Sequence, residues 1–168
     1  MKRHYLLVAS LALAASAIHA GPKTERFNDA AAFDRLKTLV GEWEGDTRMG
    51  RAHLSYELIA GGTTLVEKET GESMPAMMTV YHLDGDRLIL THYCMAGNQP
   101  RMQARSYDAE SGVVEFQFLD ATNLPAGAGH MHKARFRFVN NSHFATEWAF
   151  YENGAQKFTE TVEYTRVR

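Results

Sequence analysis

Two pairs of side chains in this sequence have types and spacing that could support binding chemistry. His92 and Cys94 lie two residues apart in one run of alternating polar and apolar residues, and His130 and His132 lie two apart in another. Residues two apart in a β-strand share a face, so each pair would act together. Imidazole and thiolate groups bind zinc or copper, and they also form hydrogen bonds at the rim of a pocket. Because strand alternation alone produces this spacing, we expect a pocket rim and keep a metal site as the alternative.

Three further polar residues could belong to the same site. Asn98 and Arg101 follow the first pair closely and could bind a carboxylate or a carbonyl group. Glu160 follows Phe158 on an apolar face, where a carboxylate needs hydrogen-bond partners or a raised pKa. Either Glu160 or His92 could act as the general base of an enzyme. No set of nucleophile, base and orienting group is visible, so we predict no catalytic residue and no enzyme.

The elements that would position these residues are β-strands. From residue 43 onward the apolar residues follow a period of two, and short turns such as Gly61-Gly62 are typical of an antiparallel meander. Twisted strands in such a meander close on themselves and leave no unpaired edge. The sequence therefore predicts an all-β fold, a ten-stranded antiparallel up-and-down barrel. We expect its strands at residues 43–49, 52–60, 63–70, 76–83, 86–94, 101–107, 113–119, 130–139, 143–151 and 155–166.

A short helix is expected to plug one end of this barrel. Residues 29–40 have a helical period and begin at a capping residue, Asn28 or Asp29. The apolar face of this helix carries Phe33, Leu36 and Val40, and we expect these side chains to bury Trp43 at the closed end.

The direction of each side chain depends on the turn that precedes its strand. A three-residue loop at residues 83–85 would place Met78, Val80 and His82 on the same face as Leu90 and His92. From the fourth strand on, even-numbered positions are mostly apolar, so we assign them to the barrel interior. The Gly61-Gly62 hairpin stays open between two registers. A two-residue turn puts Leu65 and Glu67 inside, and a three-residue turn puts Thr64 and Val66 inside.

Connections in a meander alternate between the two ends of the barrel, and this places the candidate residues in space. Residues 49–51, 71–75, 95–100, 120–129 and 152–154 should surround the open mouth, opposite the helix. The two His/Cys pairs should then meet at that mouth, pointing inward. We expect the cavity below them to be lined by Met78, Leu90, Phe116, Phe136, Trp148 and Phe158, with Glu160 deeper inside.

The first twenty residues have the order of a secretory signal. Lys2 and Arg3 precede an apolar stretch, and small residues offer a cleavage site after Ala20 or after Ala17. We expect residues 1–20 to be removed and residues 21–168 to form one domain. The stretch is too short to span a membrane stably. We expect the mature protein in the periplasm or outside the cell.

The overall charge argues against nucleic acid as a partner. The chain has 18 basic and 20 acidic residues and a formal net charge of −2. It contains no basic block and no phosphate-binding glycine loop.

The region around Trp43 resembles a known family. A helix followed by Gly41, Trp43, Gly45 and a meander is similar to the start of lipocalin-like barrels, in which a Gly-x-Trp element plugs the closed end. With residues 81–86 and 91–102, the chain resembles exported bacterial lipocalin-like proteins of unknown function, over nearly the whole mature chain. Nitrobindin-like haem proteins also begin with Gly-x-Trp-x-Gly and hold haem through a histidine near the C-terminus. Residues 158–168 contain no histidine, so that site does not carry over.

Together these features predict an exported protein that binds a small hydrophobic or amphipathic molecule in a barrel cavity. The cofactor, if there is one, and the oligomeric state stay unknown from the sequence. The alternatives are a metal- or haem-binding barrel and an enzyme that uses Glu160 or His92 as a base. The predicted ligand-binding residues are His92, Cys94, Asn98, Arg101, Phe116, His130, His132, Trp148, Phe158, Phe136 and Glu160.

Overall fold

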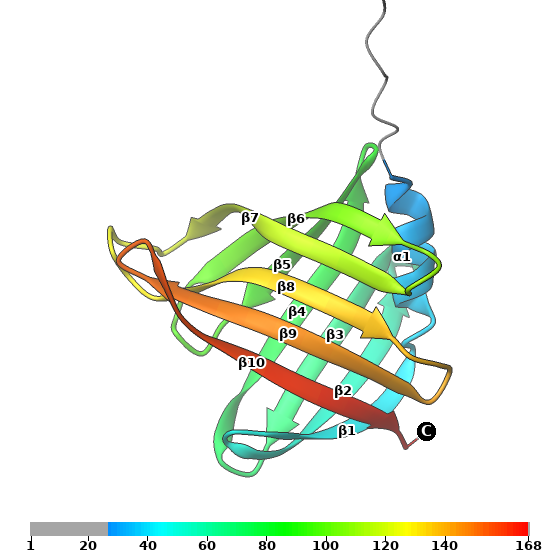
Figure 1. Ribbon diagram of the computed structural model, residues 1–168, viewed down its shortest axis with the longest axis horizontal. Helices are drawn as coiled ribbons and strands as arrows, with labels where there is room; N and C mark the ends of the chain where they lie inside the picture. Colours follow the sequence, from blue (N-terminus) through cyan, green and yellow to red (C-terminus); the bar gives the residue numbers. More distant parts are fainter. Residues whose placement is uncertain (1–26, 168) are drawn as a thin grey trace, which may run out of the picture.

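The computed structural model describes residues 27–167, so the predicted signal segment 1–20 lies outside the described residues. One helix, α1 (Asp29–Lys37), precedes ten strands (Figure 1). The strands are β1 (Gly41–Thr47), β2 (Gly50–Ile59), β3 (Thr64–Gly71), β4 (Met74–Asp84), β5 (Arg87–Tyr93), β6 (Gln99–Asp108), β7 (Val113–Thr122), β8 (His130–Phe138), β9 (His143–Glu152) and β10 (Ala155–Arg166). A single turn of 3-10 helix, η1 (Ala60–Gly62), joins β2 to β3.

Each strand pairs antiparallel with its neighbour in the chain, and β1 pairs with β10, so the sheet forms a closed barrel. The predicted all-β, ten-stranded fold is confirmed. The closing pair needs a glycine, because a Cβ on Gly45 would lie 2.7 Å from the carbonyl oxygen of Glu163 and 2.7 Å from the Tyr164 ring. Among the described residues, no helix has the length and apolar character needed to cross a membrane.

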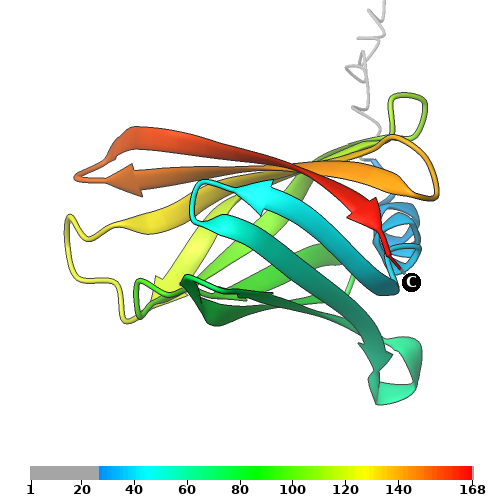
Figure 2. The same ribbon diagram turned by 90° about the horizontal axis from the view of Figure 1, so that it is seen from below.

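The helix α1 lies across one end of the barrel, and the β7–β8 loop and the β9–β10 turn lie at the other (Figure 2). The side chain of Asn28 accepts a hydrogen bond from the Ala31 backbone at 3.0 Å, which confirms the predicted cap. Asp29 is buried and accepts a hydrogen bond from the backbone of Leu88 at 2.8 Å, which ties the start of the helix to β5. The helix ends at Lys37, three residues before the predicted limit.

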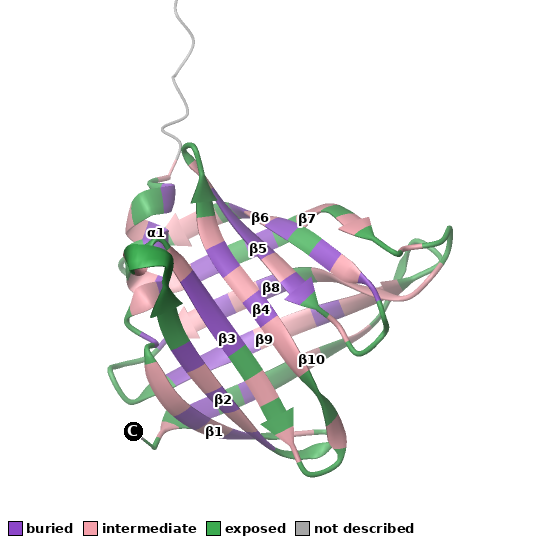
Figure 3. Cartoon of the chain, turned by 180° about the vertical axis from the view of Figure 1, so that it is seen from behind, coloured by how far each residue is buried: buried purple, intermediate pink, exposed green. Residues whose placement is uncertain are grey.

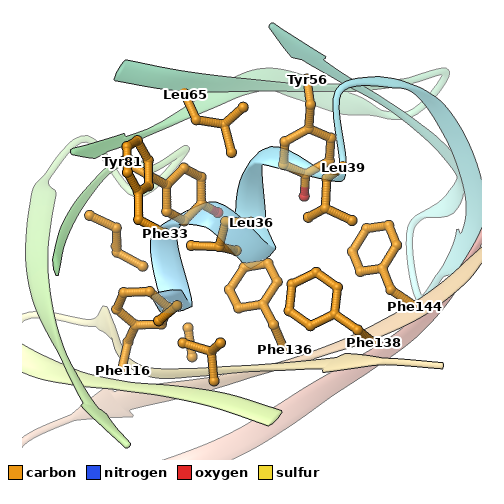
Figure 4. Packing of buried hydrophobic residues seen from close by; sticks show 14 of the residues in the cluster. Phe33, Leu36, Leu39, Tyr56, Leu65, Tyr81, Phe116, Phe136, Phe138 and Phe144 are labelled. Atoms are coloured by element: carbon orange, nitrogen blue, oxygen red, sulfur yellow. The ribbon is translucent and has the colours of Figure 1, made fainter. Parts of the chain in front are cut away.

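The closed end is packed with large apolar side chains (Figure 4). Trp43 is 1% exposed, donates its indole N–H to the carbonyl of Leu39 at 2.7 Å and meets the ring of Phe144 edge-on at 4.7 Å. Leu39 is buried, whereas Val40 is 42% exposed, so the prediction that Val40 packs under Trp43 is wrong. The reason is the early end of the helix, which turns Val40 outward and Leu39 inward.

Arg166, on the last strand β10, forms hydrogen bonds that stabilise the closed end of the barrel. Arg166 donates hydrogen bonds to the carbonyl oxygens of Thr38 and Val40, each at 2.7 Å, and to that of Asn141 at 2.9 Å. Its guanidinium lies 4.1 Å from the centre of the Trp43 ring. Arg166 therefore satisfies carbonyl groups that the end of the helix leaves unpaired.

The turn between β4 and β5 is one residue shorter than predicted. Asp84 pairs with Arg87, so the loop contains only Gly85 and Asp86, and Gly85 has a φ of 62° that suits a tight turn. The inward face of β4 therefore carries Thr79 and Tyr81. Met78, Val80 and His82, which we expected inside, lie on the opposite face.

The pairing of β2 with β3 shows which of the two predicted registers the hairpin has. Ile59 pairs with Thr64 across η1, and this even-length connection places Leu65 and Glu67 inside. Figure 3 shows buried positions along each of β2, β3 and β4, with exposed residues toward the strand ends.

The packing at the closed end predicts that Trp43→Ala should lower the free energy of unfolding by about 3–5 kcal/mol, the usual cost of truncating a buried aromatic side chain. Urea denaturation would measure the change. Val40→Ala, three residues earlier in the chain and exposed, is the matched control and should change the stability by less than about 0.5 kcal/mol. Equal effects of the two substitutions would contradict the assignment of Trp43 to the core.

Candidate functional site

A cavity of about 310 Å³ opens at the end of the barrel opposite α1. Its rim comes from residues 47–49 of the β1–β2 turn, from Met74 and from residues 95–96. These segments belong to the end that the sequence predicted as the mouth. Its apolar wall includes Leu54, Met74, Met77, Trp148, Phe150 and Phe158.

A row of polar side chains crosses four neighbouring strands at the inner part of this cavity. Tyr56 pairs with Glu67, Glu67 with Thr79, and Thr79 with His92, so the four residues form one register line from β2 to β5. All four are at most 4% exposed. We call Tyr56, Glu67, Thr79 and His92 the polar belt.

Glu67 is the centre of the polar belt. Tyr81 donates its hydroxyl to one oxygen of Glu67 at 2.6 Å, and Thr79 donates to the other at 3.2 Å. Burial raises the pKa of Glu67, and the hydrogen bonds, foremost the one from Tyr81, oppose that rise. The carboxyl is therefore buried but well supplied with donors.

The hydrogen bonds of Thr79 link Glu67 to His92. The Thr79 hydroxyl lies 3.0 Å from Nδ1 of His92, and it has a single proton to give. When Glu67 is ionised, that proton goes to Glu67, so Nδ1 of His92 must be the donor to Thr79. Nε2 of His92 is then an unprotonated acceptor. The protonation of Glu67 thus selects which tautomer His92 adopts.

His92 is a buried neutral imidazole at the cavity wall. Its ring lies 5.0 Å from that of Trp148, and burial lowers its pKa to about 4. Nε2 of His92 and the hydroxyl of Tyr56 are buried and have no hydrogen-bond partner among the described residues. Both residues line the cavity, so a molecule inside it is the natural partner for these atoms.

Two more carboxyl groups line the same cavity. Glu69 lies two residues after Glu67 on the inner face of β3, between Leu54 and Met77. Burial raises the pKa of Glu69 to about 8, and the charges of Glu67 and Glu160 add to this effect. Glu69 is therefore largely protonated at neutral pH.

Glu160 stands on the far wall, on β10. It pairs with Trp148, because the ladder of β9 and β10 shifts by one residue between Gln156 and Phe158. Glu160 accepts a hydrogen bond from the backbone N–H of Arg48 at 3.0 Å. The Arg48 guanidinium lies 4.1 Å above the Phe158 ring and 3.7 Å from Glu160.

Five of the predicted ligand-binding residues line the cavity, namely His92, Cys94, Trp148, Phe158 and Glu160. Two others, Phe116 and Phe136, lie deeper. They are at most 1% exposed and pack edge-on against Tyr81, within the filled part of the barrel. Their large rings fill the space that we expected to be hollow.

Arg101 and Asn98 also lie away from the cavity wall. Arg101 is exposed and forms an ion pair with Asp120 on β7, to which its Nε donates at 2.6 Å. Asn98 is buried and donates to the carbonyl of Gly129 at 2.8 Å, which ties the β5–β6 loop to the start of β8. Through these contacts Arg101 and Asn98 stabilise the fold, and neither side chain lines the cavity.

The expectation that His130 and His132 point into the mouth is wrong. A β-bulge shifts the β8–β9 ladder, so His130 pairs with Tyr151, Met131 pairs with Phe150, and His132 is the extra residue. Met131 therefore lines the cavity and the imidazoles do not.

Instead, the two imidazoles contact each other and nearby rings. Nε2 of His130 lies 3.0 Å from Nδ1 of His132, and His132 stacks on Tyr151 at 4.3 Å and on Phe118 at 4.9 Å. The predicted cluster of four residues is thus not formed. Within residues 27–167, no group of three or more His, Cys, Asp or Glu residues is arranged to hold a metal ion.

The sequence analysis missed most of the polar lining of the cavity. Tyr56, Glu67, Glu69 and Thr79 were not among the predicted site residues, although one of the two open registers of the β2–β3 hairpin placed Glu67 inside. A buried glutamate on an otherwise apolar face is itself a signal for a site. The analysis also missed a group of methionines on the cavity lining, which are Met49, Met74, Met77, Met95 and Met131.

Comparison with known proteins supports the fold. No family model matches the chain, and no curated protein matches it. The chain is similar to the crystal structure of a protein of unknown function from the DUF3598 family of Nostoc punctiforme PCC 73102, with a TM-score of 0.54 and 15% identity. The match covers 79% of this chain and 49% of that one, so this chain spans about half the length of that protein. At this identity the likeness shows the barrel fold alone.

The raised pKa of Glu69 predicts a pH-dependent stability. The folded chain keeps this proton up to about pH 8, whereas the unfolded chain loses it near 4.5. The contribution of Glu69 to stability is therefore complete below pH 4.5 and is lost as the pH rises through 8, by at most about 1.4 kcal/mol per pH unit. Urea denaturation of the wild type and of Glu69→Gln over this range would measure it.

Subtracting the pH dependence of the stability of Glu69→Gln from that of the wild type removes the contributions of His92 and Glu67, because both proteins contain these residues. Glu57→Gln, on the exposed face of β2, is the control and should leave the curve of the wild type unchanged. A Glu69→Gln curve with the same slope as the wild type would contradict the assignment.

Proposed function

We propose that this chain is an exported protein that binds a partly apolar small molecule in the cavity of its barrel. The observation that carries the proposal is Nε2 of His92 at the wall of that cavity, a buried polar atom without a hydrogen-bond partner within residues 27–167. A buried polar atom without a hydrogen bond costs free energy, and a ligand that supplies the bond recovers it.

The lining of the cavity agrees with this function. Ligand pockets usually have mostly apolar walls and a few polar groups that fix the orientation of the ligand. Here Trp148, Phe150 and Phe158 form an aromatic wall, and the polar belt lies at the inner part. The methionines of the lining are flexible and polarisable, which suits a site that adapts to the shape of its ligand.

Binding is a better explanation of this site than catalysis. His92, with a pKa of about 4, is a weak base at neutral pH. Glu160 accepts the Arg48 N–H, and burial raises the pKa of Cys94, so this thiol stays protonated and poorly nucleophilic. The proposal therefore keeps the prediction that the protein is not an enzyme.

The proposal also includes a lipocalin-like identity and export. The plugging helix, the Gly-x-Trp element at the closed end and the meander support the first. The second rests on the order of residues 1–20 in the sequence. The intact mass of protein recovered from the periplasm or medium should correspond to a chain that begins near Gly21, and a mass that still includes residues 1–20 would contradict export with cleavage.

Two adjacent methionines on β4 offer a direct test of the cavity. Met77 lines it, whereas Met78 pairs with Lys68 and Tyr93 on the opposite face. Met77→Trp should fill part of the cavity and weaken the binding of an uncharged fluorescent apolar probe such as Nile red or N-phenylnaphthylamine by at least about tenfold, which corresponds to about 1.4 kcal/mol.

Met78→Trp adds the same volume outside the barrel and should leave probe affinity unchanged. Thermal melting of both variants would show that each is folded. Equal losses in the two variants, or no binding of either probe by the wild type, would count against a ligand cavity.

A further inference from the structure

The carboxyl groups that face the cavity outnumber its basic side chains. Three carboxyl groups line it, those of Glu67, Glu69 and Glu160, and one cationic side chain, that of Arg48. Glu160 already binds Arg48, through the backbone N–H at 3.0 Å and the guanidinium at 3.7 Å. Glu69 has no hydrogen bond and no ion pair with any residue in the described part of the chain. The cavity therefore contains a carboxyl group that no residue of the described chain binds.

The mouth of the cavity already holds one cation of the protein itself. The guanidinium of Arg48 lies 4.1 Å above the Phe158 ring, beside the carboxylate of Glu160. A cation between an aromatic face and a carboxylate is favourable in a site with restricted access to water. Glu69 and the ring of Trp148 line the same cavity and have no cationic partner within residues 27–167.

Building on the proposed function, we propose that the cavity recognises apolar amines, with the ammonium group bound by Glu69 and the hydrocarbon part against the aromatic wall of Trp148 and Phe150. A primary ammonium has three N–H donors, and the unpartnered Nε2 of His92 is an acceptor whenever Glu67 is ionised. A fatty acid would add a negative charge to a cavity that already contains the carboxylate of Glu160, which disfavours it.

We assign the change of protonation on amine binding to Glu69, because the ammonium binds at this carboxyl group. Burial keeps the hydroxyls and the thiol neutral, and His92 is neutral because its pKa is about 4. Burial raises the pKa of Glu69 to about 8, so an entering ammonium displaces the Glu69 proton. The other groups that face the cavity are Arg48, Tyr56, Glu67, His92, Cys94, Glu160 and Tyr164.

The test compares four probes of equal chain length by isothermal titration calorimetry at neutral pH. Octylamine carries a positive charge and N–H donors, and octyltrimethylammonium carries the positive charge without N–H donors. Octanol has neither the charge nor ammonium donors, and octanoate carries a negative charge. The wild type should bind octylamine at least about tenfold more tightly than octanol, and octanoate most weakly. Titration in buffers of different ionisation enthalpy should show a proton released when octylamine binds and none when octanol binds.

Glu69→Gln should remove the preference for octylamine and the release of the proton, while its affinity for octanol changes by less than about threefold. Glu57→Gln removes the same charge from the outer face of β2 and should keep the preference. An equal loss in both variants would mean that net charge alone sets the preference, and it would overturn the inference.

If Glu69→Gln does not fold, measurements on the wild type alone still test the binding of amines. Equal affinities for octylamine and octanol, or binding of octylamine without release of a proton, would overturn the amine assignment and leave the proposed binding function intact. If none of the four probes binds, the proposed function and the inference both fail.

Discussion

The structure depends on burying the carboxyl group of Glu67 with donors on both of its oxygens. Both donors, Thr79 and Tyr81, come from the adjacent strand β4. A shift of the β3–β4 register by one residue would turn these side chains outward and leave a carboxyl group unpaired in the core, at a cost of several kcal/mol. The buried carboxyl thus specifies the register, and the register in turn positions Thr79 to orient the imidazole of His92.

The polar belt also marks the boundary between two halves of the barrel. On the side of α1 the interior is filled, and the register line next to the belt consists of Leu65, Tyr81 and Leu90, each with no exposed surface. On the other side the interior opens into the cavity. A filled closed end can supply the stability of the domain, which allows the open end to keep uncompensated polar atoms. This division explains why the large rings of Phe116 and Phe136 belong to the core although they share a face with cavity residues.

The sequence was sufficient to predict the strands, the barrel, the plugging helix and the end at which the cavity opens, because these follow from periodicity and from the alternation of connections. The direction of individual side chains was harder, because it changes with every single inserted residue. The two-residue loop at Gly85 and the extra residue His132 each reversed a prediction. No local pattern distinguishes a bulge from a regular strand at these positions. The inward direction of Glu67 could be predicted from the sequence, since one of the two registers considered for the β2–β3 hairpin placed it inside.

The closing contacts of the barrel have a consequence for the order in which the chain can fold. Strands β2 to β9 pair only with neighbours in sequence, and such hairpins form early, but β1 finds its second partner only in β10. Arg166, near the end of β10, also supplies the donors for Thr38 and Val40 at the end of the helix. Before β10 pairs with β1, β1 has an unpaired edge and the carbonyl groups of Thr38 and Val40 lack the hydrogen bonds of Arg166. Barrel closure joins the two strands that are farthest apart in the sequence, so it has a large loop-closure cost and is expected to be a late step of folding.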